Sequence, residues 1–150
     1  MANRIYAGGA GNQPDIVEGR ANGAAILPGC LLERSVATGV DELALTNNAS
    51  TTFGNEFLVA REIAQTSGGS IDTAWPDDNT VEAIAVKSGE LVYVRVATGN
   101  NIATKGAPIA SAGNGQFKLA LTDGTEQVFA FAEEVINVAA DNTLVLVRAA

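Results

Sequence analysis

Turn-forming residues recur along this chain at short intervals and favour short strands over helices. The segments between the turns are rich in Val, Ile, Leu and Thr, the composition of β-strands. The turns are marked by Pro28-Gly29, Asn47-Asn48, Ser67-Gly68-Gly69-Ser70, Trp75-Pro76-Asp77-Asp78, Lys87-Ser88-Gly89, Asn100-Asn101 and Gly113-Asn114-Gly115. Turns spaced by about 8–12 residues are typical of barrels and sandwiches. The sequence therefore predicts a mainly β fold, a small antiparallel β-barrel or β-sandwich.

The length of 150 residues suits one domain and is too short for two cores of ordinary size. Residues 1–23 include Gly8, Gly9, Gly11, Gly19 and Gly23 and few apolar side chains. This composition predicts an extended N-terminal arm over residues 1–23 and a single β domain over residues 24–150. Such an arm is expected to be disordered alone or held by a neighbour.

Two stretches of the chain resemble each other. Leu43-Ala-Leu-Thr46 precedes an Asn-Asn turn and a strand-like segment, and Leu119-Ala-Leu-Thr122 precedes an Asp-Gly turn and a similar segment. One explanation is a duplicated β unit, with two similar halves that share one core. The other is chance similarity among strands rich in Ala, Leu and Thr. The sequence leaves both open.

The charge balance excludes several classes of partner. The chain has 9 basic and 17 acidic residues, a net charge of -8, and no run of Lys or Arg. Nucleic acids and anionic membranes both require clustered cations, so neither is an expected partner. A signal peptide is not apparent, and Cys30 has no second cysteine for a disulfide. We expect synthesis in the cytoplasm of the producing cell.

No candidate catalytic set emerges from the residue types. Histidine is absent, which removes Ser-His-Asp and Cys-His catalysis and most zinc sites. Paired carboxylates occur at Asp41-Glu42, Asp77-Asp78 and Glu133-Glu134, but adjacent residues of a strand point to opposite faces. Asp72 with Asp77-Asp78 lacks the spacing of an EF-hand, and Cys30 is expected to be a buried structural thiol. We therefore expect no catalytic, cofactor or metal site and no enzyme activity.

Three apolar side chains are candidate anchors for contacts between protomers. Ile5 and Tyr6 lie in the predicted arm, and Trp75 lies in a polar turn. Large aromatic residues are enriched at the centres of protein interfaces. Trp75 has two interpretations, either a lid over the core or an exposed interface anchor.

The pattern of the second half resembles a known family. The residues that carry it are Val86-Lys-Ser-Gly-Glu-Leu-Val-Tyr-Val-Arg-Val96, Asn101-Ile-Ala-Thr-Lys-Gly-Ala-Pro-Ile109, Phe129-Ala-Phe-Ala-Glu-Glu134 and Thr143-Leu-Val-Leu-Val-Arg148. In this glycine-punctuated texture the chain resembles the capsid decoration, or cement, proteins of tailed bacteriophages. The resemblance implies a structural virion protein on the outer capsid surface that stabilises the head. It also implies the major capsid protein as a partner and self-association as a dimer or trimer. It supplies no binding residues.

A second function class remains open, a non-enzymatic ligand- or carbohydrate-binding β module of a fibre or adhesin. Sugar-binding modules commonly display aromatic platforms, and this chain has two Tyr and one Trp. That composition favours the structural virion protein.

Overall fold

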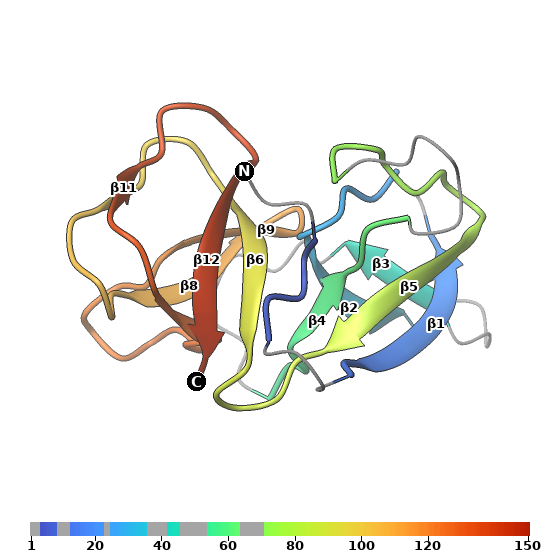
Figure 1. The fold of residues 1–150 in the computed structure, drawn as a ribbon, viewed down its shortest axis with the longest axis horizontal. Helices are drawn as coiled ribbons and strands as arrows, with labels where there is room; N and C mark the ends of the chain where they lie inside the picture. The colour runs from blue at the N-terminus through green and yellow to red at the C-terminus, as the bar shows by residue number, and fades with distance from the viewer. Residues whose placement is uncertain (1–3, 9–12, 23–24, 36–41, 46–53, 64–70) are drawn as a thin grey trace.

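The computed structural model describes residues 4–8, 13–22, 25–35, 42–45, 54–63 and 71–150. These residues form twelve strands and no helix, so the predicted mainly β fold is confirmed. Figure 1 shows two curved sheets side by side, with the N-terminal segment running between them. Within the described ranges there is no helix of the length and hydrophobicity that crossing a membrane requires.

The first sheet is a five-stranded barrel. Its strands are β1 (Asp15–Ala21), β2 (Leu31–Ser35), β3 (Glu42–Leu45), β4 (Leu58–Ala60) and β5 (Thr80–Ala85). Neighbours follow the order β1-β3-β2-β4-β5, and β5 returns to β1 to close the ring. A small apolar core fills this barrel; it contains Ala21, Ile26, Cys30, Leu32, Leu58, Ala60, Val81 and Ala83.

The second sheet is also a five-stranded barrel. Its strands are β6 (Leu91–Val96), β8 (Pro108–Gly113), β9 (Gln116–Leu119), β10 (Ala130–Ala132) and β12 (Thr143–Ala149). Neighbours follow the order β10-β12-β6-β9-β8, with β8 returning to β10. A two-stranded ribbon of β7 (Asn101–Ile102) and β11 (Ile136–Asn137) lies beside it.

The two barrels have the same topology. When β6, β8, β9, β10 and β12 are matched in chain order with β1 to β5, each strand has corresponding neighbours in the other ring. The pairs β1/β3 and β6/β9 are parallel, and every other pair within each ring is antiparallel. The chain therefore has two similar β halves, as the first explanation of the sequence similarity proposed.

Matching backbone contacts support this equivalence. The N–H of Gly29 donates to the carbonyl of Ala60 at 2.8 Å, and the N–H of Gly106 donates to the carbonyl of Ala132 at 2.7 Å. Both glycines have positive φ, 91° for Gly29 and 87° for Gly106, a conformation that glycine adopts without steric cost. Each glycine lies just before the second strand of its barrel, so the turn itself is repeated.

The register of the strands corrects the alignment drawn from the sequence. Leu32 and Ile109 are counterparts, since each lies three residues after its matched glycine. Leu32 pairs with Leu45, and Ile109 pairs with Leu119. Leu119 therefore corresponds to Leu45 and not to Leu43, a shift of two residues. A shift of two residues keeps every side chain on its own face of the strand. The alternation of apolar and polar residues is therefore the same in both alignments and does not distinguish them.

The N-terminal region differs from the predicted arm over residues 1–23. Asp15–Ala21 is β1, which pairs with β5 at six positions. Tyr6 forms a β-bridge with Val92 of the second barrel. A domain boundary at residues 23 and 24 would therefore cut through the first barrel. The inward side chains of β1 are small, so its strand pattern is weak in the sequence.

The barrels are joined by an apolar row on the outer face of the first. Leu31, Val59 and Ile84 are cross-strand neighbours on β2, β4 and β5. Each is at most 2% exposed, because the row packs in the same cluster as the core of the second barrel. Phe57 adds its ring, 5.9 Å from that of Phe117 and 5.5 Å from that of Phe129 between centroids. The second core is thus completed by the first barrel.

The counterpart of this row in the second barrel has a different composition. It consists of Pro108, Phe131 and Arg148 on β8, β10 and β12. Arg148 is exposed, and its guanidinium carbon lies 5.7 Å from the centroid of the Phe131 ring. Glu133 forms ion pairs with Arg148 at 2.8 Å and with Lys105 at 2.6 Å. This row of the second barrel is therefore partly exposed and includes a charged residue, whereas the row of the first barrel is buried and apolar.

A substitution in the core of the second barrel should destabilise both barrels, because Leu31, Val59 and Ile84 of the first barrel belong to that core. Phe117→Ala removes a fully buried ring and should cost about 3–5 kcal/mol of unfolding free energy. Trp75, the only tryptophan, lies in the first barrel, so its fluorescence reports unfolding there. Urea transitions followed by this fluorescence and by circular dichroism should shift together. A fluorescence transition that stays in place would show that the barrels unfold separately.

Candidate functional site

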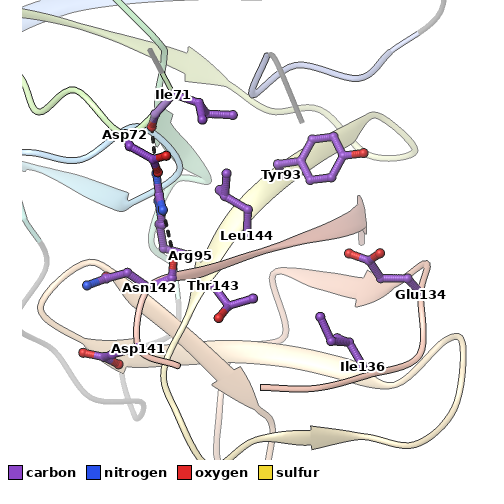
Figure 2. A pocket seen from close by; sticks show the side chains of 10 residues that line it. All are labelled: Ile71, Asp72, Tyr93, Arg95, Glu134, Ile136, Asp141, Asn142, Thr143 and Leu144. Carbon is purple, nitrogen blue, oxygen red and sulfur yellow. Dashed lines mark hydrogen bonds and ion pairs between the residues drawn. The ribbon is translucent and has the colours of Figure 1, made fainter. Parts of the chain in front are cut away.

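A pocket of about 430 Å³ lies on the outer side of β6 and β12, at the junction of the barrels (Figure 2). It is lined by Ile71, Asp72, Tyr93, Arg95, Glu134, Ile136, Asp141, Asn142, Thr143 and Leu144. Figure 2 shows the Arg95 side chain extending from β6 toward Ile71 and Asp72, with Glu134 and Ile136 on the other side of the pocket. The lining combines charged and apolar groups from both halves of the chain.

Arg95 is the most constrained charged residue in this pocket. It is buried, with 5% of its surface exposed, and its guanidinium group donates four hydrogen bonds to partners from three segments. Nε donates to the carbonyl of Pro28 at 2.8 Å, and Nη1 donates to the carbonyl of Asn142 at 2.8 Å. Nη2 donates to the carbonyl of Ile71 at 2.7 Å and to Oδ1 of Asp72 at 2.9 Å. These bonds make Arg95 a clamp between the barrels rather than a free anion-binding group.

The internal repeat shows that this clamp is specific to the second barrel. Arg20 on β1 holds the position that corresponds to Arg95 on β6, and Asp78 corresponds to Asn142. Asp78 and Asn142 both have positive φ, 63° and 59° respectively. The Arg20 side chain is half exposed and forms an ion pair with Asp78 at 2.6 Å. Arg20 therefore faces solvent in the first barrel. Arg95, at the matching position of the second barrel, is covered by the first barrel.

The carboxylates near the pocket hold backbone groups. Glu134 Oε1 accepts a hydrogen bond from the N–H of Leu146 at 2.7 Å, and Asp141 Oδ1 accepts one from the N–H of Thr98 at 3.1 Å. Such contacts fix turns and strand ends. Within the ranges that the structure describes, no three His, Cys, Asp or Glu side chains gather as metal ligands would.

The carboxylates of the adjacent acidic pairs noted in the sequence are likewise held by different partners. Hydrogen bonds from Lys105 and then Arg148 lower the pKa of Glu133, which keeps it ionised. Its neighbour Glu134 contacts the backbone at Leu146, as described above. Asp78 pairs with Arg20, and Asp41 lies outside the described residues. The structure does not bring either described pair together on one substrate position.

The three candidate anchors all make contacts inside the chain. Ile5 is fully buried; its N–H donates to Glu62 Oε2 at 3.0 Å, and its carbonyl accepts from Tyr93 at 2.8 Å. Tyr6 is half-buried, and its hydroxyl donates to Glu90 Oε1 at 3.3 Å. Ile5 is therefore corrected from an interface anchor to a core residue, because it fills the junction between the barrels.

Trp75 forms part of the first barrel. It is half-buried, pairs with Ile26 by two backbone hydrogen bonds, and packs against the small core. Its indole N–H donates to the carbonyl of Arg61 at 2.6 Å. This geometry is that of a lid over the core, the first of the two interpretations of Trp75.

Cys30 is buried in the core of the first barrel. Burial raises the pKa of its thiol to about 11, while the positive charge of Arg95 opposes this shift. The thiol is therefore protonated at neutral pH. This agrees with the expected structural role.

Arg95 was not among the residues singled out from the sequence. The signal was present, because an arginine interrupts the apolar strand Leu91-Val-Tyr-Val-Arg-Val96. A cation inside such a strand requires partners when it is buried. Identifying those partners required the fold, since Pro28, Ile71 and Asn142 are distant in sequence.

Comparison with known proteins gives a likeness of fold. No protein-family model matches the sequence, and no curated protein matches it. Among solved structures, the chain is similar to the N base of the head fibre protein gp8.5 of bacteriophage phi29, with a TM-score of 0.57 and 14% sequence identity. The match covers 92% of this chain and 95% of that chain. At this identity the likeness establishes a shared β architecture across both barrels.

Loss of the Arg95 clamp should destabilise the protein much more than loss of its counterpart. Arg95→Met leaves three carbonyls without their donor and should cost about 3 kcal/mol of unfolding free energy. Arg20→Met removes the exposed ion pair with Asp78, which should cost less than about 1 kcal/mol. Urea denaturation of both variants tests this contrast. Equal losses would mean that Arg95 does not join the barrels.

The Cys30 thiol should be unreactive in the folded protein. At pH 8, Ellman's reagent should label it slowly in buffer and rapidly in denaturant, because the folded pKa lies above that of an exposed thiol. The sign of the shift also predicts that stability falls as pH rises from about 9 to about 11, where only the unfolded chain readily forms the thiolate. Rapid labelling in buffer would contradict the buried position.

Proposed function

We propose that this chain is a structural protein of a bacteriophage virion that binds the outer surface of the head. In this proposal its partner is the major capsid protein, and the chain stabilises the shell as a decoration subunit. The observation that supports it most strongly is the fold likeness, over nearly the full length of both chains, to the base of a phage head fibre. Independently of that likeness, the pattern of short strands punctuated by glycines in the sequence resembles that of the decoration proteins.

The chemistry of the chain supports a role without catalysis. The buried Arg95 donates to three backbone carbonyls and to Asp72. The pocket carboxylates Glu134 and Asp141 accept hydrogen bonds from the backbone of Leu146 and Thr98. The one thiol is protonated and buried. Groups that are committed to holding the two barrels together suit a rigid module that presents a surface. We include self-association as a dimer or trimer in the proposal, since repeated weak contacts on a symmetric lattice add through avidity.

A second candidate function is the base module of a head fibre. The observation in its favour is the description of the similar structure as the N base of a head fibre. A fibre base attaches an appendage, whereas a decoration subunit reinforces the shell. The two functions therefore differ in their effect on shell stability.

The proposal predicts that purified protein binds undecorated phage heads in a fixed ratio and raises their rupture temperature. A ligand that binds only the assembled shell stabilises it by mass action. Electron microscopy would give the occupancy, and light scattering during heating would give the rupture temperature. Sparse binding with an unchanged rupture temperature would favour the fibre base, and no binding to heads would reject both functions.

A further inference from the structure

The second barrel exposes the face that the first barrel buries at the junction. In the first barrel, the turn at Gly29 and the apolar row that follows it are buried. In the second barrel, the matched turn spans residues 104–107, and the matched row is Pro108, Phe131 and Arg148. The first three residues of the turn and Arg148 are exposed, and the others are half-buried. In Figure 1, β8 and β12 lie on the side of β6 that faces away from the first barrel.

The matched glycines of the two turns show this difference directly. A Cβ atom added to Gly29 would lie 2.9 Å from Cδ2 of Leu144 and 3.3 Å from Cγ of Arg95, both in the second barrel. A Cβ atom added to Gly106 would have no atom of the described residues within 4 Å. The same turn is therefore packed against a neighbouring barrel in one half of the chain and open to solvent in the other.

Two cations on this face share one carboxylate. Glu133 pairs with Lys105 at 2.6 Å and with Arg148 at 2.8 Å. Elsewhere in the described chain, cations such as Arg61 and Lys87 each have a carboxylate of their own. The three side chains on the exposed face therefore sum to one positive charge, on a chain whose net charge is -8. A carboxylate supplied by a partner would balance that charge.

Arg148 is held in place and still has hydrogen-bond donors to offer. Its Nε donates to Oε1 of Glu133, and its guanidinium carbon lies 5.7 Å from the centroid of the Phe131 ring. In the part of the chain that the structure describes, no group accepts a hydrogen bond from its Nη atoms. The side chains of Arg148 and Lys105 are 47% and 69% exposed. A guanidinium placed in this way can bind a carboxylate, and the Phe131 ring beside it offers an apolar surface.

We propose that residues 104–107 and the row of Pro108, Phe131 and Arg148 form a docking face for another protein, which presents a carboxylate beside an apolar side chain. The carboxylate accepts hydrogen bonds from Arg148 and Lys105, and the apolar side chain packs on the rings of Phe131 and Pro108. Exposed ion pairs are individually weak, so firm attachment depends on several copies binding at once. The inference rests on the proposed function only where it takes that protein to belong to the shell.

A second copy of this chain cannot repeat the internal contact at the docking face. In the first barrel, the N–H of Leu31 donates to the carbonyl of Gly115 at 2.7 Å. The counterpart of Leu31 is Pro108, which has no N–H to donate. The site of the second barrel that receives the apolar row is also filled already by the first barrel of the same chain. These differences favour a different protein as the partner.

Peptide titrations test the docking face on the full-length protein. The probe is the capped tetrapeptide Gly-Asp-Leu-Gly, and its match is Gly-Asn-Leu-Gly. Titration of isotopically labelled protein to millimolar peptide should shift the backbone amide signals of Lys105, Gly106 and Phe131. The Asp peptide should bind about fivefold more tightly than the Asn peptide, which is the upper end of the effect of one exposed ion pair. No shift on the docking face, or equal affinities, would overturn the proposal.

Charge variants of the protein act as controls. Lys105→Gln and Arg148→Gln should each weaken binding of the Asp peptide, whereas Lys87→Gln, which removes an exposed cation between β5 and β6, should not. Glu133→Gln should strengthen binding, because the two cations then have no internal carboxylate. Weaker binding to Glu133→Gln than to the wild type would overturn the assignment of the two cations, even if Arg148→Gln proved to be misfolded.

Binding to heads separates this inference from the proposed function. If the wild type and Lys87→Glu bind undecorated heads, while the combination of Lys105→Glu with Arg148→Glu does not, the partner segment belongs to the shell. If no form binds heads but the peptides bind as described, the docking face stands and the proposed function fails. If all forms bind heads equally and no peptide binds, the proposed function stands and this inference fails. Concentration-dependent dimerisation that Arg148→Gln abolishes would assign the docking face to a second copy, against the proposal.

Discussion

The second barrel depends on the first to complete its core. β6 and β9 meet at Val96 and Phe117, and the apolar row of Leu31, Val59 and Ile84 packs in the cluster behind them. Five short strands enclose little apolar volume, so a barrel of this size gains substantially from a shared core. The position of Arg95 follows from this arrangement. Because the first barrel covers it, its charge has to be satisfied by carbonyls from both sides of the junction.

The same arrangement explains how the molecule handles strand edges. An unpaired edge invites contact with other chains, and proteins usually cover or interrupt it. In the second barrel, residues 5–7 and the carbonyl of Gly29 occupy the edge of β6, where the N–H of Arg95 donates to Gly29 at 2.9 Å. In the first barrel the matching strand, β1, carries the exposed Glu18. The two barrels have the same topology and thus differ mainly in the segments that lie along these strand edges.

The sequence predicted the class of fold because turns and β-type segments are local features. It also indicated the repeat, although the identical four residues were aligned two positions out of register. β1 was missed because Val17, Gly19 and Ala21, its inward residues, are small and include a glycine. Ile5 was assigned to an interface because its burial depends on a distant junction that sequence patterns do not show. The Arg95 clamp was beyond reach for the same reason, since each of its partners comes from a separate segment.

The difference between the two outer rows bears on how the repeat ends. A barrel whose outer face fits the open side of the next barrel is a heterologous unit, and such units can add without limit into a fibre. Here the first barrel presents Leu31, Val59 and Ile84, whereas the second presents Pro108, Phe131 and Arg148 at the same positions. Arg148 is held by Glu133, so a third barrel stacked there would bury a charged pair instead of an apolar row. The second barrel thus lacks the wholly apolar row through which the first barrel completes the core of its neighbour.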